Sequence, residues 1–214
     1  MERRLPLRER KKLTTRQTIV RAAGTLVEAG GYEKTTMRDI AGAAKLSYQT
    51  LYNYFPTKAQ VLKALLTADM TSVAATASEI VEGYDGDLLD SLYALNRCRL
   101  EVISHRDRDL WRVVAMDVWQ DTGSSGHVFD IIDVDAWRTL QTLLNRAQGL
   151  GHLDPYVDVD LLADTLHVLS QQAFSRYIMD ARRSKTELLK TLQDQQRLVV
   201  IPYVRTYLKS FPTR

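Results

Sequence analysis

Helix-start signals punctuate this sequence, and apolar residues follow each one at a spacing of three or four positions. In such a signal, a Ser or Thr precedes Glu, Gln or Asp by three residues, so that two side chains satisfy backbone N–H groups left free at a helix start. No stretch alternates apolar and polar residues over more than four positions, which argues against strands. The pattern therefore predicts an all-α fold. The signals are the pairs Thr14 and Gln17, Thr36 and Asp39, Thr57 and Gln60, and Ser184 and Glu187.

The first third of the chain is expected to hold a flexible arm and four helices. Residues 1–13 are basic and contain few apolar positions, which is typical of an arm. Gly30 and Gly31 are expected to end the first helix, as glycines often do, and Ser47 is a suitable N-cap for the third. The expected helices cover residues 14–30, 36–44, 47–54 and 57–82.

The remaining two-thirds also show helical spacing. Pro202 is expected to kink or interrupt the last helix, because proline lacks a backbone donor and crowds the preceding turn. Breaks are expected at 83–87, 123–126 and 149–156, where glycine, proline and short polar residues gather. The expected helices cover residues 88–104, 107–120, 130–148, 158–182 and 184–211.

Charge is distributed unevenly along the 214 residues. Residues 1–70 carry 13 Lys and Arg against 6 Asp and Glu, a net charge of +7, whereas the rest carry 16 against 20. A basic segment on a mildly acidic remainder suggests that only the first third meets a polyanion, although a solvated basic face without a partner would look the same.

Composition favours a globular cytoplasmic protein. Hydrophobic residues make up 45% of the chain, which suffices for a core. No apolar run reaches the roughly 18 residues that a membrane-spanning helix needs, so no membrane association is expected. The single cysteine, Cys98, has no second thiol for a disulfide or a metal site.

The expected helices over 36–44 and 47–54 are short and only a few residues apart, the spacing of a helix-turn-helix. An α-helix fits the major groove of B-DNA, where base edges present distinguishable donors and acceptors. Leu51 is expected to face inward, while most of the second helix is polar or amphipathic. A helical bundle that carries a tyrosine-rich surface helix and does not bind DNA is the alternative at this point.

Three residues illustrate how this surface would recognise DNA. Gln49 has the donor and acceptor that pair with adenine. The Tyr52 hydroxyl can reach a phosphate or a base. Lys58 lies in the first turn of the expected fourth helix, where a positive charge opposes the helix dipole but would suit a bound phosphate.

The runs Gly31–Ala41 and Ala44–Phe55, followed by Thr57 and Lys58, resemble the DNA-binding domain of the tetracycline-repressor (TetR) family. The shared pattern is a G-[YF]-x-x-[TS]-[TS] entry, an I-A pair and an L-Y-x-[YH]-F-x-[ST]-K end, and it spans about residues 14–62. Lys45 departs from it, because the family usually has glycine in the turn. A left-handed residue there costs about 1 kcal/mol when it is not glycine; alternatively, Lys45 reaches the DNA backbone.

The resemblance implies two domains and a set of DNA contacts. The domains are an arm with a helix-turn-helix, 1–56, and a linking helix with an effector-binding and dimerisation domain, 57–214. The resemblance places Arg38 and residues 48–50 at bases, and Thr36, Tyr52, Tyr54 and Lys58 at phosphates. The DNA-binding candidates are Thr36, Arg38, Lys45, Ser47, Tyr48, Gln49, Thr50, Tyr52, Tyr54 and Lys58.

The resemblance further implies a homodimer that binds a palindromic operator and is released from it by a small-molecule effector. In the family, the last two helices of each subunit form the dimer interface. The effector-binding candidates are Tyr93, Arg97, Trp111, Met116, Trp119, Trp137, His167, Gln171, Phe174 and Tyr177. The interface candidates are Leu162, Leu166, Leu169, Leu188, Leu192, Val199 and Tyr203.

Other classes of function remain open. No Ser-His-Asp signature, phosphate-binding glycine loop or H-E-x-x-H motif is present, so an enzyme is not expected. No cofactor or metal is expected either. A helical adaptor, or an activator without a small-molecule inducer, is the alternative to an effector-controlled repressor.

Overall fold

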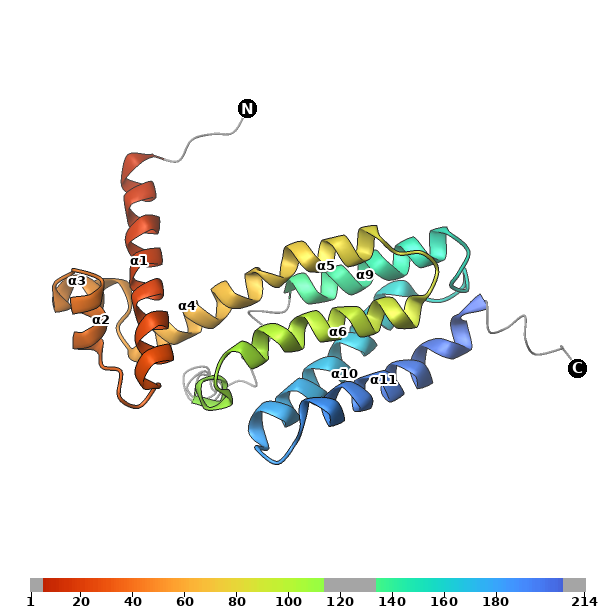
Figure 1. Ribbon diagram of the computed structural model, residues 1–214. Coiled ribbons are helices and arrows are strands. Elements are labelled where there is room, and N and C mark those ends of the chain that lie inside the picture. Colours follow the sequence, from red (N-terminus) through yellow and green to blue (C-terminus); the bar gives the residue numbers. More distant parts are fainter. Residues whose placement is uncertain (1–5, 114–133, 206–214) are drawn as a thin grey trace, which may run out of the picture.

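The computed structural model describes residues 6–113 and 134–205. Every named element in these residues is a helix, and the one bridge between extended residues joins Leu153 to Val204. The prediction of an all-α fold is therefore confirmed for this part of the chain. Figure 1 shows three N-terminal helices at one end of an elongated bundle.

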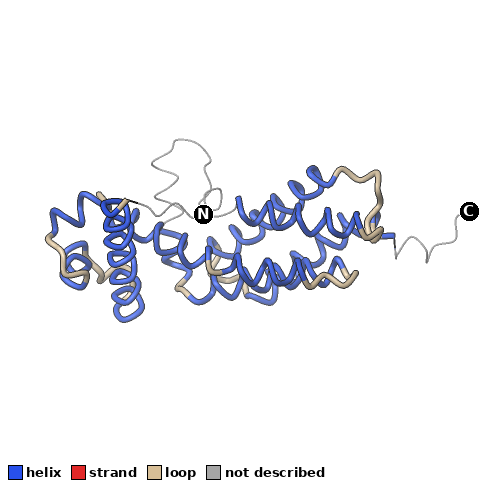
Figure 2. The backbone as a smooth tube through the Cα atoms, turned by 90° about the horizontal axis from the view of Figure 1, so that it is seen from above, coloured by secondary structure: helices blue, strands red, loops and turns tan. Residues whose placement is uncertain are grey.

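The N-terminal helices, called the head below, are α1 (Leu7–Gly30), α2 (Met37–Ala43) and α3 (Tyr48–Tyr54). The next helix, α4 (Lys58–Thr71), packs against α1 and leads into the bundle. Seen from above in Figure 2, the head lies at one end of the molecule and the bundle extends away from it.

The beginning of α1 differs from the sequence prediction. The helix begins at Leu7 rather than Thr14, so the expected capping box at Thr14 and Gln17 is not its start. The Thr14 hydroxyl instead donates to the Arg10 carbonyl at 3.0 Å, within the helix. Leu, Arg, Glu and Lys fill residues 7–13, and these are strong helix formers, which explains why the helix extends through the expected arm.

The remaining helices form the body of the molecule. Residues 108–113 are also helical and agree with the expected start of the 107–120 helix. The rest of that helix, the 123–126 loop, the start of the 130–148 helix and the end of the last helix lie outside the described residues. The body helices are α5 (Val73–Glu82), α6 (Leu88–His105), α9 (Val134–Gly149), α10 (Val159–Met179) and α11 (Lys185–Val200).

The expected helix over 57–82 is two helices, separated at Ser72. The Ser72 hydroxyl donates to the Asp69 carbonyl at 2.5 Å, and its backbone N–H donates to the same carbonyl at 3.1 Å. These bonds span three residues rather than four, so they tighten the last turn of α4 and interrupt the α-helical ladder.

The α10 helix ends earlier than expected, and the last helix is interrupted. The α10 helix ends at Met179, because Asp180 is extended and its carboxylate accepts from the Arg182 backbone N–H at 3.1 Å. The interruption predicted at Pro202 is confirmed, since α11 ends at Val200 and a 3₁₀ turn follows over Ile201–Tyr203.

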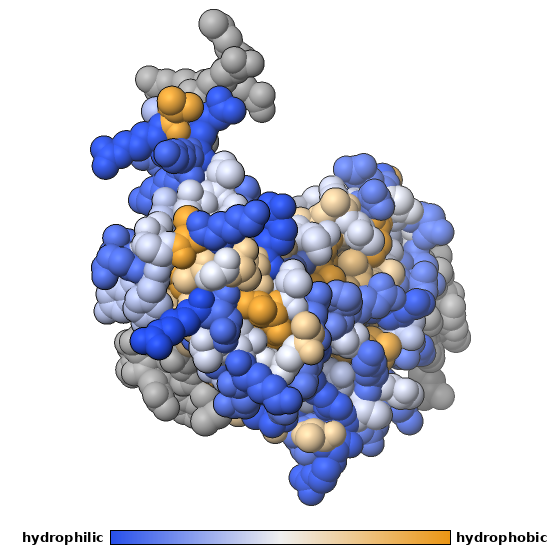
Figure 3. All heavy atoms as spheres, turned by 60° about the vertical axis from the view of Figure 1, so that its left-hand side comes forward, coloured by the Kyte–Doolittle hydropathy of each residue, from blue (hydrophilic) through white to orange (hydrophobic). Residues whose placement is uncertain are grey.

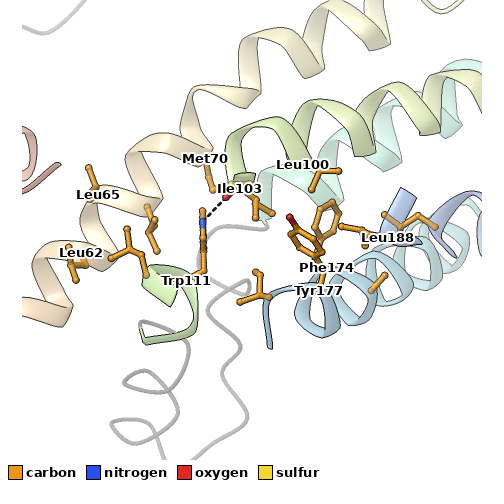
Figure 4. Close-up of a cluster of buried hydrophobic side chains, with 14 of the residues drawn as sticks. Leu62, Leu65, Met70, Leu100, Ile103, Trp111, Phe174, Tyr177 and Leu188 are labelled. Atoms are coloured by element: carbon orange, nitrogen blue, oxygen red, sulfur yellow. Dashed lines mark hydrogen bonds between the residues drawn. The ribbon is translucent and has the colours of Figure 1, made fainter. Parts of the chain in front are cut away.

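Three clusters of buried apolar residues hold the molecule together. One lies in the head and includes Ile19, Ile40, Leu51 and Phe55. The second joins α4, α6 and α10 around Trp111, whose indole N–H donates to the Ile103 carbonyl at 3.0 Å (Figure 4). The third fills the far end of the body, among α5, α6, α9 and α10. The second cluster also includes Val27 of α1, so α1 packs into both head and body.

Candidate nucleic-acid interface

The first helix of the helix-turn-helix, α2, begins at the predicted capping box. The Asp39 backbone N–H donates to the Thr36 hydroxyl at 3.2 Å, and the Thr36 backbone N–H donates to the Asp39 carboxylate at 3.0 Å. The Thr36 hydroxyl also donates to this carboxylate at 2.6 Å, and these bonds hold the pKa of Asp39 below its usual value. The box fixes where α2 begins and hence where the turn after it falls.

The turn between α2 and α3 depends on Lys45. Its φ of 54° is the one positive value among the described residues other than glycine, as the missing turn glycine suggested. In this conformation the N–H of Lys45 donates to the Gly42 carbonyl at 3.0 Å, and that of Leu46 donates to the Ala41 carbonyl at 2.9 Å. The side chain of Lys45 is exposed.

The predicted N-cap of α3 is confirmed. Ser47 Oγ accepts from the Thr50 backbone N–H at 3.1 Å, and the Ser47 and Thr50 hydroxyls lie 2.8 Å apart. Leu51 and Phe55 anchor the helix in the head cluster, and the Arg16 guanidinium lies 4.4 Å from the centre of the Phe55 ring. The burial of Leu51 fixes which face of α3 turns outward.

The outer face of α3 carries the predicted recognition residues. Tyr48 and Tyr52 are 49% and 46% exposed, and their rings stack with centroids 6.4 Å apart. Beside them, the Gln49 amide donates to the Asn53 side-chain oxygen at 3.2 Å. Arg38 of α2 is also exposed, whereas Thr50 and Tyr54 are partly covered. The outer face thus combines two aromatic hydroxyls with two side-chain amides.

Lys58 has partners within the protein. Its ammonium donates to the Tyr32 and Thr35 carbonyls, each at 3.0 Å, and lies 3.8 Å from the centre of the Tyr32 ring. These contacts tie the loop before α2 to the first turn of α4. Thr57 caps the same turn by accepting from the Gln60 N–H at 3.2 Å, which is one half of the expected box.

Arg106 joins the head, α4 and the end of α6. Its guanidinium donates to both Asp69 carboxylate oxygens, at 2.6 and 3.2 Å, and to Glu28 of α1 at 2.6 Å. The arginine side chain is only 9% exposed. Its hydrogen bonds to Asp69 raise the pKa of the guanidinium further, so the charge is permanent.

The body contains a partly open cavity of about 180 Å³ between the end of α4 and helices α5, α6, α9 and α10. Most of its wall is apolar, and polar groups from Asn96, Arg99 and Ser170 complete it. The Asn96 amide donates to the Gln196 side-chain oxygen at 2.9 Å, and the Arg99 guanidinium lies 5.0 Å from the centre of the Phe174 ring. Sequence reasoning missed this wall, although Asn96 and Arg99 interrupt the buried stripe of α6 at helical spacing.

The described effector-binding candidates are not among the residues that line this cavity. Trp111, Phe174 and Tyr177 are core residues of the second cluster, and Trp137 packs against the third. The remaining candidates are more polar or more exposed: Arg97 faces Glu101 at 3.8 Å, Tyr93 is partly buried, and His167 lies 3.0 Å from the amide of Gln171. Met116 and Trp119 lie outside the described residues.

Four of the predicted interface residues are buried inside the subunit, each at most 5% exposed. They are Leu162, Leu166, Leu188 and Leu192, whose helices turn these positions into the core. Leu169 and Val199 are partly buried, and Tyr203 is exposed. Three exposed apolar residues of α10 and α11 are one or two positions away: Leu161 (64%), Val168 (55%) and Leu198 (78%).

Two further searches concern the described residues only. No group of three or more His, Cys, Asp and Glu side chains there is arranged to hold a metal ion. Among the helices described, none is both long and apolar enough to cross a membrane.

Two short capped helices, a tight turn between them and an outward polar face define a helix-turn-helix module. Residues 19–65 match the family model described as "Bacterial regulatory proteins, tetR family". The helix-turn-helix segment of this chain is therefore similar to the DNA-binding domain of the TetR family.

One curated relative is similar in sequence over part of the chain. The chain is 33% identical over 92 residues to YvkB of Bacillus subtilis (strain 168), an HTH-type transcriptional regulator. That match covers 43% of this chain and 47% of YvkB, so the chain matches about half of this curated relative.

Solved structures extend the similarity of fold to nearly the whole chain. Thermus thermophilus FadR, a TetR-family repressor solved with lauroyl-CoA, has a TM-score of 0.67 and 22% identity over 93% of this chain and 96% of its own. RolR, solved with resorcinol, has a TM-score of 0.62 and 20% identity over 89% of each chain.

Proposed function

We propose that this protein is a dimeric transcriptional repressor that binds an operator through α3 and leaves it when a small molecule enters the body. The outer face of α3 is the observation that carries this proposal. The buried Leu51 orients the helix, so that Tyr48, Gln49 and Tyr52 project outward together. Amides and phenols on one face of a helix can pair with base edges and phosphates in a major groove.

Two copies of α3 are needed to read a palindromic operator. In such a complex the recognition helices lie about 34 Å apart, so that they enter successive major grooves. The exposed Leu161, Val168 and Leu198 of α10 and α11 supply apolar surface that a second copy would cover. We therefore assign the dimer contact to these residues rather than to the buried leucines next to them.

The helix α4 gives the effector a route to the head. At its first turn, Lys58 binds the Tyr32 and Thr35 carbonyls of the head. At its last turn, Met70 and Thr71 line the cavity of the body. A ligand that fits one position of α4 better than another would shift the position of the head.

The cavity indicates the size and chemistry of the effector. An engineered cavity of about 150 Å³ holds benzene, so a cavity of about 180 Å³ fits a molecule with one ring. Asn96, Arg99 and Ser170 offer hydrogen bonds to such a molecule, while Leu95 and Leu140 contact its apolar part. Resorcinol, the ligand of RolR, belongs to this size class, whereas lauroyl-CoA does not.

The test is selection of bound duplexes from a random pool, followed by affinity measurements on the selected sequence. Gln49→Ala should relax base preference at one position of each half-site, because Gln49 can read a base edge. Tyr52→Phe should weaken binding to all duplexes, because it removes a phosphate donor. Gln193→Ala on the exposed side of α11 is the matched control. Selection that enriches no sequence would overturn the proposal.

The same duplex then tests the effector. Small phenols and lauroyl-CoA are added separately to the complex, and release of the duplex is measured. Release by a phenol supports the cavity assignment, whereas release by lauroyl-CoA alone contradicts the proposed size class. Purified protein that is a monomer at micromolar concentration would contradict the dimer.

A further inference from the structure

The part of α1 that replaces the expected arm has a distinct basic face. Arg8, Lys11, Lys12, Thr15 and Arg16 recur at intervals of three and four residues, so they lie on one side of the helix. The four basic residues are exposed. Figure 3 shows hydrophilic side chains along this projecting part of the molecule. A flexible arm would scatter these charges, whereas the helix holds them in a row.

This basic face forms one wall of a groove whose other wall is the helix-turn-helix. The groove has a volume of about 1100 Å³, and its second wall includes Leu46, Thr50, Asn53 and Tyr54. On the first wall, Glu9 is the acidic residue beside Arg8, Lys11, Lys12 and Arg16, and the second wall carries no charge. The groove is therefore strongly positive and also offers hydroxyl and amide groups.

The position of the groove relative to α3 matters for its role. Tyr48, Gln49 and Tyr52 occupy the exposed face of α3, whereas Thr50 and Tyr54 are partly covered on the side toward α1. The groove thus runs along one edge of the surface that would enter the major groove. In duplex DNA, a phosphate backbone follows each edge of the major groove.

Intrinsic helix propensity forms this part of α1, and packing against the rest of the protein adds little to it. Residues 7–14 are all exposed, so the segment buries no apolar face. Like charges three and four positions apart, as in Arg8, Lys11 and Lys12, destabilise a helix. In the first turn, Arg8 and Arg10 oppose the helix dipole, and Glu9 offsets only part of this effect. A polyanion along this face would remove both penalties.

We propose that the groove between α1 and α3 seats a phosphate backbone of duplex DNA beside the major groove that α3 enters. Arg8, Lys11 and Lys12 neutralise successive phosphates, while Thr50 and Asn53 donate hydrogen bonds to their oxygens. Arg16, held over the Phe55 ring, fixes the angle of α1 to the rest of the head. The inference rests on the proposed DNA binding and assigns to it a sequence-independent contact.

The test is the salt dependence of binding by the double variant Lys11→Gln/Lys12→Gln. The logarithm of the binding constant falls with the logarithm of salt concentration, with a slope of about −0.9 for each phosphate neutralised. The variant should therefore lose about 0.9 from the magnitude of the slope for each contact removed, while its base preference stays unchanged. Binding is measured by fluorescence anisotropy with the selected duplex between about 50 and 200 mM salt.

Two matched variants separate the groove from charge alone. Lys185→Gln/Lys190→Gln on α11 removes the same charge far from the head and should leave the slope unchanged. Adding Thr14→Lys/Gln17→Lys to the first variant restores the charge on the opposite side of α1. If this variant restores the salt dependence, charge alone suffices and the proposed phosphate contact in the groove is wrong. The proposal is also wrong if Lys11→Gln/Lys12→Gln leaves the slope unchanged. Wild-type protein that binds no duplex would instead overturn the proposed function itself.

Discussion

The candidate functional residues of the head lie on its outer surface, whereas those of the body line a cavity inside it. In the head, a small cluster around Leu51 and Phe55 is surrounded by helices whose outer faces carry the polar residues. In the body, Asn96 and Arg99 line a cavity between helices. The hydrophobic periodicity of a single helix shows which of its residues face outward. The residues that line a cavity depend instead on how several helices pack together. The two regions therefore differ in how far sequence alone can describe them.

The largest expected effect comes from Phe55→Ala. Removing a fully buried aromatic ring costs about 3–5 kcal/mol, and the head cluster has few other large side chains. DNA binding should be lost, and amide protection should fall in α2 and α3 far more than in α10 and α11. Urea unfolding and hydrogen exchange measure both effects.

Phe174→Ala in the body is the matched control, because Phe174 is also fully buried. Protection should then fall first in α10 and α11. If either variant lowers amide protection equally in both regions, the head and the body open as one unit. The two regions would then not be independent in stability.

The next effect concerns the link between the two regions. Arg106→Met should lower the free energy of unfolding by about 2–3 kcal/mol, because it removes charged hydrogen bonds to Asp69 and Glu28. Urea unfolding measures the loss. Arg182→Met is the control: its pair with Asp180 is exposed to solvent, so its loss should leave the free energy of unfolding nearly unchanged.

The same pair of variants sharpens the comparison between head and body. If Arg106 connects them, Arg106→Met should also weaken the effect of an effector on DNA binding, while Arg182→Met should not. A variant at Arg106 that is as stable as the wild type would refute the link.

The smallest effect is a gain in stability at the turn of the head. Lys45→Gly should raise the free energy of unfolding by about 0.5–1 kcal/mol, because glycine adopts a φ of 54° without steric cost but loses more entropy on folding. Lys45→Ala removes the charge and keeps the strain, so it should leave stability nearly unchanged. Equilibrium urea unfolding of both variants checks the difference, and a destabilised Lys45→Gly would contradict it.

Much of the head could be predicted from sequence because its signals are local. The caps at Thr36 and Ser47, the inward Leu51 and the departure at Lys45 each follow from a few neighbouring residues. The start of α1 was missed, because helix propensity in residues 7–13 outweighed the signal at Thr14. The internal partners of Lys58 were also missed, since the Tyr32 carbonyl is 26 positions away.

The body shows why the remaining residues could not be predicted. Large aromatic side chains such as Trp111 and Phe174 suit a ligand pocket by type, but they pack against neighbours in the second cluster. Buried leucines such as Leu162 and exposed ones such as Leu161 are adjacent in the sequence. Only the packing of α9, α10 and α11 decides which of them faces outward.

The break at Ser72 separates α4 from α5, so α4 can tilt as a short rigid helix about its C-terminal end. Its 14 residues give it a length of about 21 Å. A tilt of about 5° at that end would carry its first turn through roughly 2 Å. Because Lys58 ties that turn to the loop before α2, α3 would travel with it. A step of this size is comparable with the length of a hydrogen bond, so in the proposed operator complex a small rearrangement in the body would be enough to misalign α3 with the bases.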